Sequence, residues 1–274
     1  MNTLNTMNTM SAVDNKYIDA LSEFIDSHNS SNPEHFIDDS HGIHHMLTVL
    51  YHASNALCLV DSTEKEKTKV KLAALLHDID DAKYFPNNKN YENARQILSN
   101  TVSDKDELSC SDIDDIIKMI SWVSSSKNGD VIPEEARNKE YLLYPRYADR
   151  LEALGITGIW RTLEYTLKKG APLFTRDTLK AHNEEDLFTN IATPERYKQY
   201  SGASSSMMDH FYDKLLRLGV YPIRNKYFDS ETEKRQQPLI DIALYFGKNS
   251  ITEAELENYT RDFIKKHTDN KNLI

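Results

Sequence analysis

The residues of this chain best suited to chemistry are an adjoining histidine and aspartate, His77 and Asp78, which close the apolar helical run Val70–Leu76. An upstream histidine cluster contains His45, and a downstream apolar segment contains Asp149. Imidazole nitrogens and carboxylate oxygens are together good ligands for Mn²⁺, Fe²⁺ or Zn²⁺, and for Mg²⁺ as oxygen ligands increase. Taken singly, each of these residues is commonly a surface, core or capping residue. The combination of three separated segments is what predicts a divalent-metal site.

The predicted helices could turn these side chains toward one ion. Successive helical residues point about 100° apart, so His77 and Asp78 can approach an ion from neighbouring directions. In a predicted helix over residues 41–60, His41, His45 and His52 share a face. Asp149 lies in a segment where an unpaired carboxylate would be costly to bury, and a metal ion would remove that cost.

The elements that must position these residues are predicted to be helices. Apolar residues recur at helical spacing, and no stretch shows the sustained alternation that is typical of strands. The low content of Gly and Pro, 8 of each in 274 residues, with 39% hydrophobic residues, is typical of a soluble helical protein. The predicted helices cover residues 16–28, 41–60, a segment ending near 77, 91–99, 112–123, 142–168, 204–218, 239–246 and 253–266. The fold class is therefore predicted to be all-α.

Composition limits the partners and the compartment. A formal charge of −10 argues against nucleic-acid binding, which needs a dense basic surface. No run approaches the roughly 18 apolar residues that span a bilayer, and the N-terminus lacks the pattern of a secretory signal. Cys58 and Cys110 lie outside any metal-binding or redox spacing, which favours free thiols in a reducing compartment. We expect a cytoplasmic protein without a membrane partner.

Four stretches, taken together, resemble the HD-domain superfamily of metal-dependent phosphohydrolases. They are Ser40–Val49, Ala73–Lys83, Ala148–Thr162 and Met208–Leu216. The chain looks most similar to small bacterial HD proteins that hydrolyse nucleotides. The resemblance runs from about Ser40 to Leu218 and implies an HD-domain helical bundle, which we expect over residues 15–225. We expect a disordered tail at 1–14, from its repeated Asn-Thr-Met units, and a C-terminal helical extension at 226–274. The apolar faces of that extension could pack on the domain or form a homo-oligomer contact.

The resemblance also implies the ligands of the metal. His45, His77, Asp78 and Asp149 correspond to the four residues that hold one divalent ion. Mn²⁺ is the expected ion, with Mg²⁺, Fe²⁺, Co²⁺, Ni²⁺ and Zn²⁺ as alternatives.

Further residues are expected to handle water and substrate. Asp81 and Lys83, shortly after the ligand pair, are the candidate catalytic residues. Arg150, His210 and Lys214 are the candidate contacts to a polyphosphate.

Two positions depart from the pattern of the subgroup. Thr48 stands where an arginine is usual, and Tyr147 stands where an aspartate is usual. Neither position provides a metal ligand, so all four ligands remain.

The function implied is hydrolysis of a nucleotide or related small phosphate ester, with a nucleoside or deoxynucleoside triphosphate as the expected substrate. In the expected mechanism, hydroxide held by the metal attacks phosphorus. A phosphodiesterase or a 5′-nucleotidase could use the same ligands, and a non-catalytic nucleotide-binding module could keep them. The sequence does not distinguish between these functions, because the shape of the pocket, rather than the set of metal ligands, determines which substrate binds.

Overall fold

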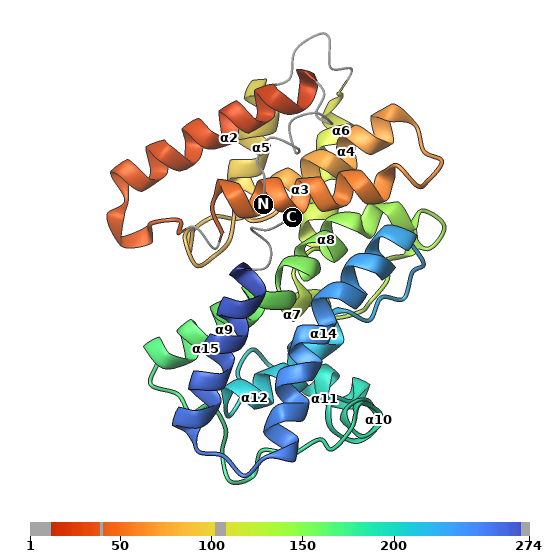
Figure 1. Cartoon of the computed structure of the whole chain (residues 1–274). Coiled ribbons are helices and arrows are strands. Elements are labelled where there is room, and N and C mark those ends of the chain that lie inside the picture. Colours follow the sequence, from red (N-terminus) through yellow and green to blue (C-terminus); the bar gives the residue numbers. More distant parts are fainter. Residues whose placement is uncertain (1–11, 39–40, 102–107, 270–274) are drawn as a thin grey trace. The chain divides into compact units, whose positions relative to one another are not determined.

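Helices joined by turns and loops make up the described part of the chain. The computed structural model describes residues 12–38, 41–101 and 108–269, and it contains no strand within these ranges. The prediction of an all-α fold is therefore confirmed (Figure 1). No helix in the same ranges is both long enough and apolar enough to cross a membrane.

Two compact units divide the chain, Met1–Asp149 and Arg150–Ile274. The boundaries expected from the sequence, at 15–225 and 226–274, stay predictions. The tail expected at 1–14 lies outside the described residues as far as residue 11, and the first helix begins at Ala12.

The first unit packs helices that are distant in sequence. Helix α4 packs on α3 and on α6, and α2 packs on α5. In Figure 1, α3 and α4 run side by side in orange. The elements are α2 (Ala12–Ser31), η2 (Pro33–His35), α3 (Ile43–Leu57), α4 (Glu64–Leu75), α5 (Glu92–Thr101), α6 (Cys110–Ser121), α7 (Ser125–Asn128), η3 (Glu134–Ala136), η4 (Glu140–Leu143) and α8 (Tyr144–Glu152), whose last residues belong to the second unit.

Helix α4 has a defined start and a defined end, and both matter for the ligand pair. At its start, Thr63 Oγ1 accepts the N–H of Glu66, and the Glu66 carboxylate accepts the N–H of Thr63. This capping box satisfies N–H groups that no helical carbonyl can reach. At its end, α4 stops at Leu75, so that His77 and Asp78 lie in the turn that follows. The helix end predicted near residue 77 is thus confirmed.

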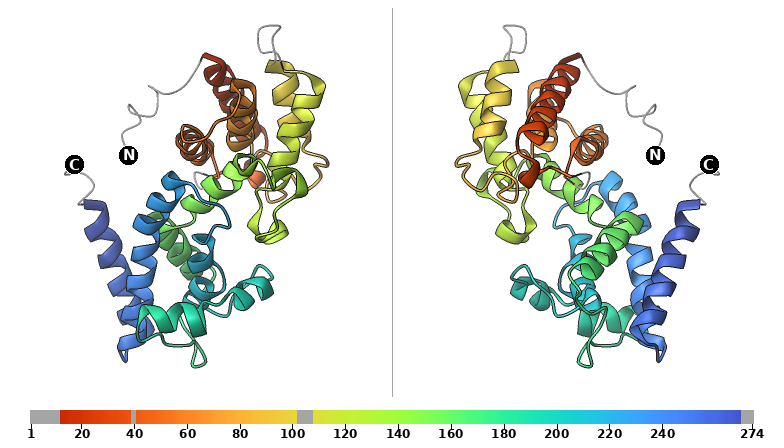
Figure 2. Two further views of the ribbon diagram at one scale, coloured as in Figure 1. Left: turned by 90° about the vertical axis from the view of Figure 1, so that its right-hand side faces the viewer. Right: turned by 90° about the vertical axis from the view of Figure 1, so that its left-hand side faces the viewer.

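The second unit is built around α9. Both α14 and α15 pack on α9. Figure 2 shows α14 and α15, the two blue helices, side by side. Between them, Tyr245 of α14 stacks on Tyr259 of α15 with 3.4 Å between ring centroids. The elements are α9 (Gly155–Lys168), α10 (Glu184–Asp186), η5 (Leu187–Ile191), α11 (Pro194–Gln199), α12 (Met207–His210), η6 (Phe211–Leu215), α13 (Leu216–Leu218), α14 (Lys226–Lys248) and α15 (Glu253–Asp269).

Two helices of this unit differ from the sequence prediction. Helix α14 begins at Lys226 rather than after Pro238, which lies inside it. Its first half is polar and shows no apolar periodicity, and the helix starts there because the Asn225 side chain accepts the N–H of Tyr227. The helix predicted at 204–218 begins at Met207 and contains the π-helical turn η6. Hydrophobic spacing does not encode such a widened turn.

Candidate metal centre

Three elements of the first unit bring four ligand-type side chains together. His45 lies in the first turn of α3, His77 and Asp78 follow the end of α4, and Asp149 lies on α8. The packing of α4 on α3 places the Nε2 atoms of His45 and His77 3.2 Å apart. The sequence-predicted ligands therefore meet in one cluster.

Each carboxylate of this cluster lies close to both imidazoles. Asp78 Oδ2 is 3.4 Å from Nε2 of His45 and 3.4 Å from Nε2 of His77. Asp149 Oδ1 is 3.5 Å from Nε2 of His45 and 3.7 Å from Nε2 of His77. Ligands held at about 2.0–2.2 Å from one ion lie about 2.8–3.6 Å apart in octahedral or tetrahedral arrangements. The donor atoms of His45, His77 and Asp149, which all lie within 4.8 Å of one another, could hold one divalent ion, and Asp78 offers a further donor beside both imidazoles.

The cluster has a buried side and an open side. The side chains of His77 and His45 are 0% and 7% exposed, whereas those of Asp78 and Asp149 are 20% and 30% exposed. Water and a ligand can therefore reach the cluster from the carboxylate side, while the imidazoles are shielded.

The ionisation of the four groups shows what the cluster lacks by itself. Burial lowers the pKa of His45, but hydrogen bonds with Asp149 and Asp78 outweigh it and raise the pKa to about 10. Burial likewise lowers the pKa of His77, and Asp78 and Asp149 raise it overall. For Asp78 and Asp149 burial acts to raise the pKa, yet the facing imidazoles hold both below the ordinary value. Two carboxylates this close to the same imidazoles favour positive charge between them, which protonated imidazoles or a divalent cation can supply.

A hydrogen bond behind His77 leaves its other ring nitrogen directed at the cluster, as a metal ion would require. Nδ1 of His77 lies 2.9 Å from the carbonyl oxygen of Ala74. Because a carbonyl only accepts, Nδ1 must donate, and Nε2 is the nitrogen that faces the cluster. Metal-binding histidines typically donate their other ring nitrogen in this way. The residues therefore fit a divalent metal ion.

The two candidate catalytic residues lie on the loop that follows Asp78. Asp81 Oδ1 accepts the N–H of Lys83 at 2.8 Å, which closes a turn of the kind that aspartate often forms. The Lys83 ammonium donates to the hydroxyl of Tyr84 at 2.9 Å and lies 3.5 Å from Asp38 Oδ2. The structure thus ties Asp81 to the backbone and Lys83 to Tyr84.

Sequence reasoning did not single out Tyr84. Its hydroxyl lies 3.1 Å from Nδ1 of His41, whose ring centroid is 6.2 Å from that of His45. Tyr84 is 4% exposed although it lies in a loop. The aromatic pair Tyr84-Phe85 within the loop after Asp78 was the sequence signal for it.

The two departures from the family pattern have local roles. The Thr48 hydroxyl donates to the carbonyl oxygen of His44 at 2.8 Å, which makes it part of the hydrogen bonding of α3 itself. Tyr147 is fully buried on α8. Neither side chain replaces one of the four ligands.

The remaining predicted substrate contacts belong to the second unit. Lys214 Nζ lies 5.8 Å from the centroid of the Tyr200 ring, and His210 meets the same ring edge-on at 5.6 Å between centroids. Burial first, and then Lys214, lowers the pKa of His210 to about 4, so this imidazole is neutral at pH 7. Arg150 is buried, with 1% exposure. The relation of these three residues to the four ligands stays a prediction.

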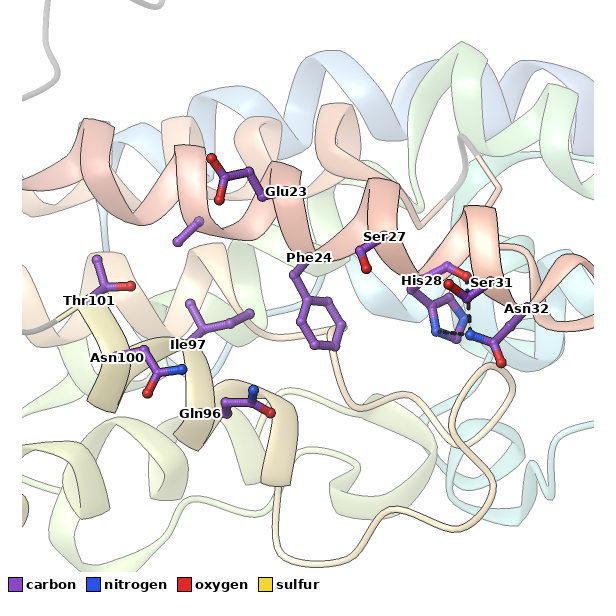
Figure 3. A pocket seen from close by; sticks show the side chains of 11 residues that line it. Glu23, Phe24, Ser27, His28, Ser31, Asn32, Gln96, Ile97, Asn100 and Thr101 are labelled. Carbon is purple, nitrogen blue, oxygen red and sulfur yellow. Dashed lines mark hydrogen bonds between the residues drawn. The ribbon is translucent and has the colours of Figure 1, made fainter.

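A separate cavity of about 590 Å³ opens between α2 and α5. Figure 3 shows Phe24 at its centre, with His28 and Asn32 hydrogen-bonded at one end and Asn100 and Thr101 at the other. None of the sequence-predicted site residues lines it.

Comparison with known proteins places the ligand cluster within a described family. Residues 42–154 match the model of the HD domain, and this range holds all four ligands. The chain is 34% identical over 241 residues to the uncharacterized protein L803 of Acanthamoeba polyphaga mimivirus, covering 82% of this chain and 92% of the relative.

Two solved structures resemble the fold. A Lactobacillus plantarum protein matches with a TM-score of 0.51 and 18% identity, over 92% of this chain and 97% of that one. The Lin1889 protein of Listeria innocua matches with a TM-score of 0.50 and 20% identity, over 81% and 93% of the two chains. At these identities the likeness concerns the fold alone.

Proposed function

We propose that this chain, which belongs to the HD-domain superfamily, hydrolyses nucleotides, and that nucleoside or deoxynucleoside triphosphates are its substrates. The HD domain is in general that of a metal-dependent phosphohydrolase. The observation that carries the proposal is the convergence of two imidazole nitrogens 3.2 Å apart with two carboxylate oxygens that each lie 3.4–3.7 Å from both nitrogens, the carboxylates being on the open side. A metal-binding cluster that is open to solvent on one side suits hydrolysis better than a purely structural metal site does.

A divalent ion bound there supplies a water of lowered pKa and a Lewis acid for a phosphoryl oxygen. The chain holds the four donors, shields the imidazoles and leaves the carboxylate side accessible. Lys83 contributes a cation that can stabilise the negative charge developing on the phosphate group. Oδ1 of Asp81 accepts the N–H of Lys83 in the turn, so Oδ2 is the oxygen that we expect to orient the attacking water.

For contacts to the rest of the nucleotide we keep the residues that the family resemblance implies, His210 and Lys214. A neutral His210 can donate or accept a hydrogen bond, and Lys214 carries a positive charge beside the ring of Tyr200. Arg150 is buried, so we assign it a supporting role rather than a direct contact with substrate. The mixed nitrogen and oxygen donors suit Mn²⁺, which we propose as the native ion.

The test is a direct activity screen. The purified protein is loaded with Mn²⁺ and with other divalent ions, and nucleoside and deoxynucleoside triphosphates are followed by chromatography. Release of pyrophosphate, phosphate or triphosphate identifies the bond that is cleaved. Nucleotide binding without turnover under every metal would instead favour the non-catalytic module.

Matched variants tie the activity to the cluster. His77→Ala and Asp149→Asn should abolish turnover, because each removes one donor atom from the ion. His182→Ala and Asp115→Asn change the same residue types at exposed positions and should leave turnover unchanged. Full turnover in both cluster variants would refute the assignment.

A further inference from the structure

A chain of hydrogen-bonding groups runs beside the metal ligands in the first unit. Lys83 Nζ lies 2.9 Å from the Tyr84 hydroxyl, which lies 3.1 Å from Nδ1 of His41. The carboxylate of Asp38 lies at a longer 3.5 Å from both Lys83 Nζ and His41 Nδ1. Tyr84 is therefore the group that joins a lysine to a histidine.

The chemistry of the donors sets the direction of these hydrogen bonds. An ammonium group can only donate, so the oxygen of Tyr84 accepts from Lys83. Nδ1 of His41 has two neighbours, the Tyr84 hydroxyl at 3.1 Å and Oδ1 of Asp38 at 3.5 Å. The shorter contact favours donation of the phenolic proton of Tyr84 to Nδ1. A neutral His41 that accepts at Nδ1 carries its own proton on Nε2.

Tyr84 is more deeply buried than the two side chains that it contacts. Tyr84 is 4% exposed, whereas the side chains of His41 and Lys83 are 24% and 53% exposed. His41 also lies against the metal cluster, since its ring meets the His45 ring edge-on at 6.2 Å. A buried phenol thus joins two accessible donors, of which His41 lies beside the ligand-type residue His45.

We propose that Tyr84 is a positioning residue, which holds the Lys83 ammonium and the His41 Nε2–H together as a pair of donors for the phosphate oxygens of the substrate. The ligand of this pair is the pyrophosphate portion of a nucleotide, so the inference rests on the proposed function. A lysine supplies charge without direction, and a neutral imidazole supplies one directed hydrogen bond. Holding both on one hydroxyl avoids the loss of side-chain freedom when substrate binds.

The first test replaces only the hydroxyl group. Tyr84→Phe keeps the ring that packs against His41 at 5.7 Å, and removes the atom that joins the two donors. We expect KM to rise about 10-fold, equivalent to about 1.4 kcal/mol, while kcat and metal affinity each change less than about 3-fold. In the Tyr84→Phe background, Lys83→Met should cost less than it does alone, because the two residues act together.

Tyr141→Phe is the matched control. The Tyr141 hydroxyl donates to Glu66 Oε1 at 2.6 Å in the same unit, so this variant also loses one phenolic hydrogen bond. It should lower thermal stability slightly and leave KM unchanged. An active enzyme whose KM is the same in the wild type and in Tyr84→Phe would overturn the proposal.

Two readouts do not depend on turnover. NMR of protein loaded with diamagnetic Zn²⁺ or Mg²⁺, at a pH well above the usual histidine value of about 6.5, should show His41 protonated at Nε2 and bare at Nδ1. Tyr84→Phe should lose this preference. Calorimetry should show weaker binding of inorganic pyrophosphate to metal-loaded Tyr84→Phe than to the wild type.

These readouts keep the two claims separate. A wild type that binds pyrophosphate more tightly than Tyr84→Phe but hydrolyses nothing would refute the proposed function and leave this inference standing. A His41 protonated at Nδ1 in the wild type, or equal pyrophosphate binding by both proteins, would refute the inference.

Discussion

Binding of a divalent ion to the His45 cluster should release protons, and its affinity should therefore rise steeply with pH. In the metal-free protein, carboxylates raise the pKa of His45 to about 10 and also raise that of His77. An ion needs the lone pair of each imidazole, so both protons must leave. At pH 7, three units below a pKa of about 10, removing the His45 proton costs about 4 kcal/mol.

Isothermal titration calorimetry measures this release directly. Titrations of Mn²⁺ between pH 6 and 9, in pairs of buffers with different ionisation enthalpies, should show release of the His45 proton throughout, and of a second proton wherever His77 is also protonated. The apparent affinity should then rise up to about 100-fold per pH unit where both imidazoles are protonated. Asp149→Asn removes a group that raises the pKa of both histidines, so it should release fewer protons. An affinity that stays flat over this range, with no proton release, would refute the reasoning.

The same ionisation predicts opposite stability trends with and without the ion. A histidine whose folded pKa is raised stabilises the fold below its unfolded pKa of about 6.5, and this stabilisation is lost as pH rises toward the folded value. The melting temperature of metal-free protein should therefore fall between about pH 6.5 and pH 10. Saturating metal should remove that fall, because the ion replaces the protons. A metal-free melting temperature that rises over this window would contradict the pairing of His45 with its carboxylates.

Three further variants test local contacts that stabilise the two units, the first two in the unit that holds the cluster and the third in the other. Glu66→Ala should lower the free energy of unfolding in denaturant by about 1–2 kcal/mol. The hydrogen bond with Lys139 is the main cause that lowers the pKa of Glu66 to about 2, so the difference in stability between wild type and variant should shrink as pH falls from about 4 to 2. Asp80→Ala should cost about 1–3 kcal/mol by the same measurement, because its carboxylate accepts the N–H of Asn93 at 2.9 Å where α5 begins. Gly247→Ala should lower the melting temperature most, since its Cβ would lie 1.8 Å from a backbone oxygen of buried Ala181.

The sequence was sufficient to predict the helices that carry the ligands, because each has a strong local signal. The apolar run before His77 requires a buried helix, and the turn that follows exposes the pair at its end. What local patterns cannot supply is the approach of α3, α4 and α8, which sets the donor distances. The contact of Tyr84 with His41 joins residues 43 positions apart, through two loops with no periodicity. Polar capping at Asn225, rather than apolar spacing, sets where α14 begins, which is why Pro238 was a misleading boundary.

The charges near the cluster imply an order of binding. In the metal-free protein the positive charge of the cluster lies on the protonated imidazoles of His45 and His77, which are engaged with Asp78 and Asp149. A phosphate group that approaches the metal-free site therefore finds no open positive centre, whereas a divalent ion would replace these two protons and offer a direct ligand position. Inorganic pyrophosphate should bind the metal-loaded protein at least about 100-fold more tightly than the metal-free protein, equivalent to about 2.7 kcal/mol. Equal binding in calorimetry with and without the ion would show that the protein recognises the phosphate group by itself.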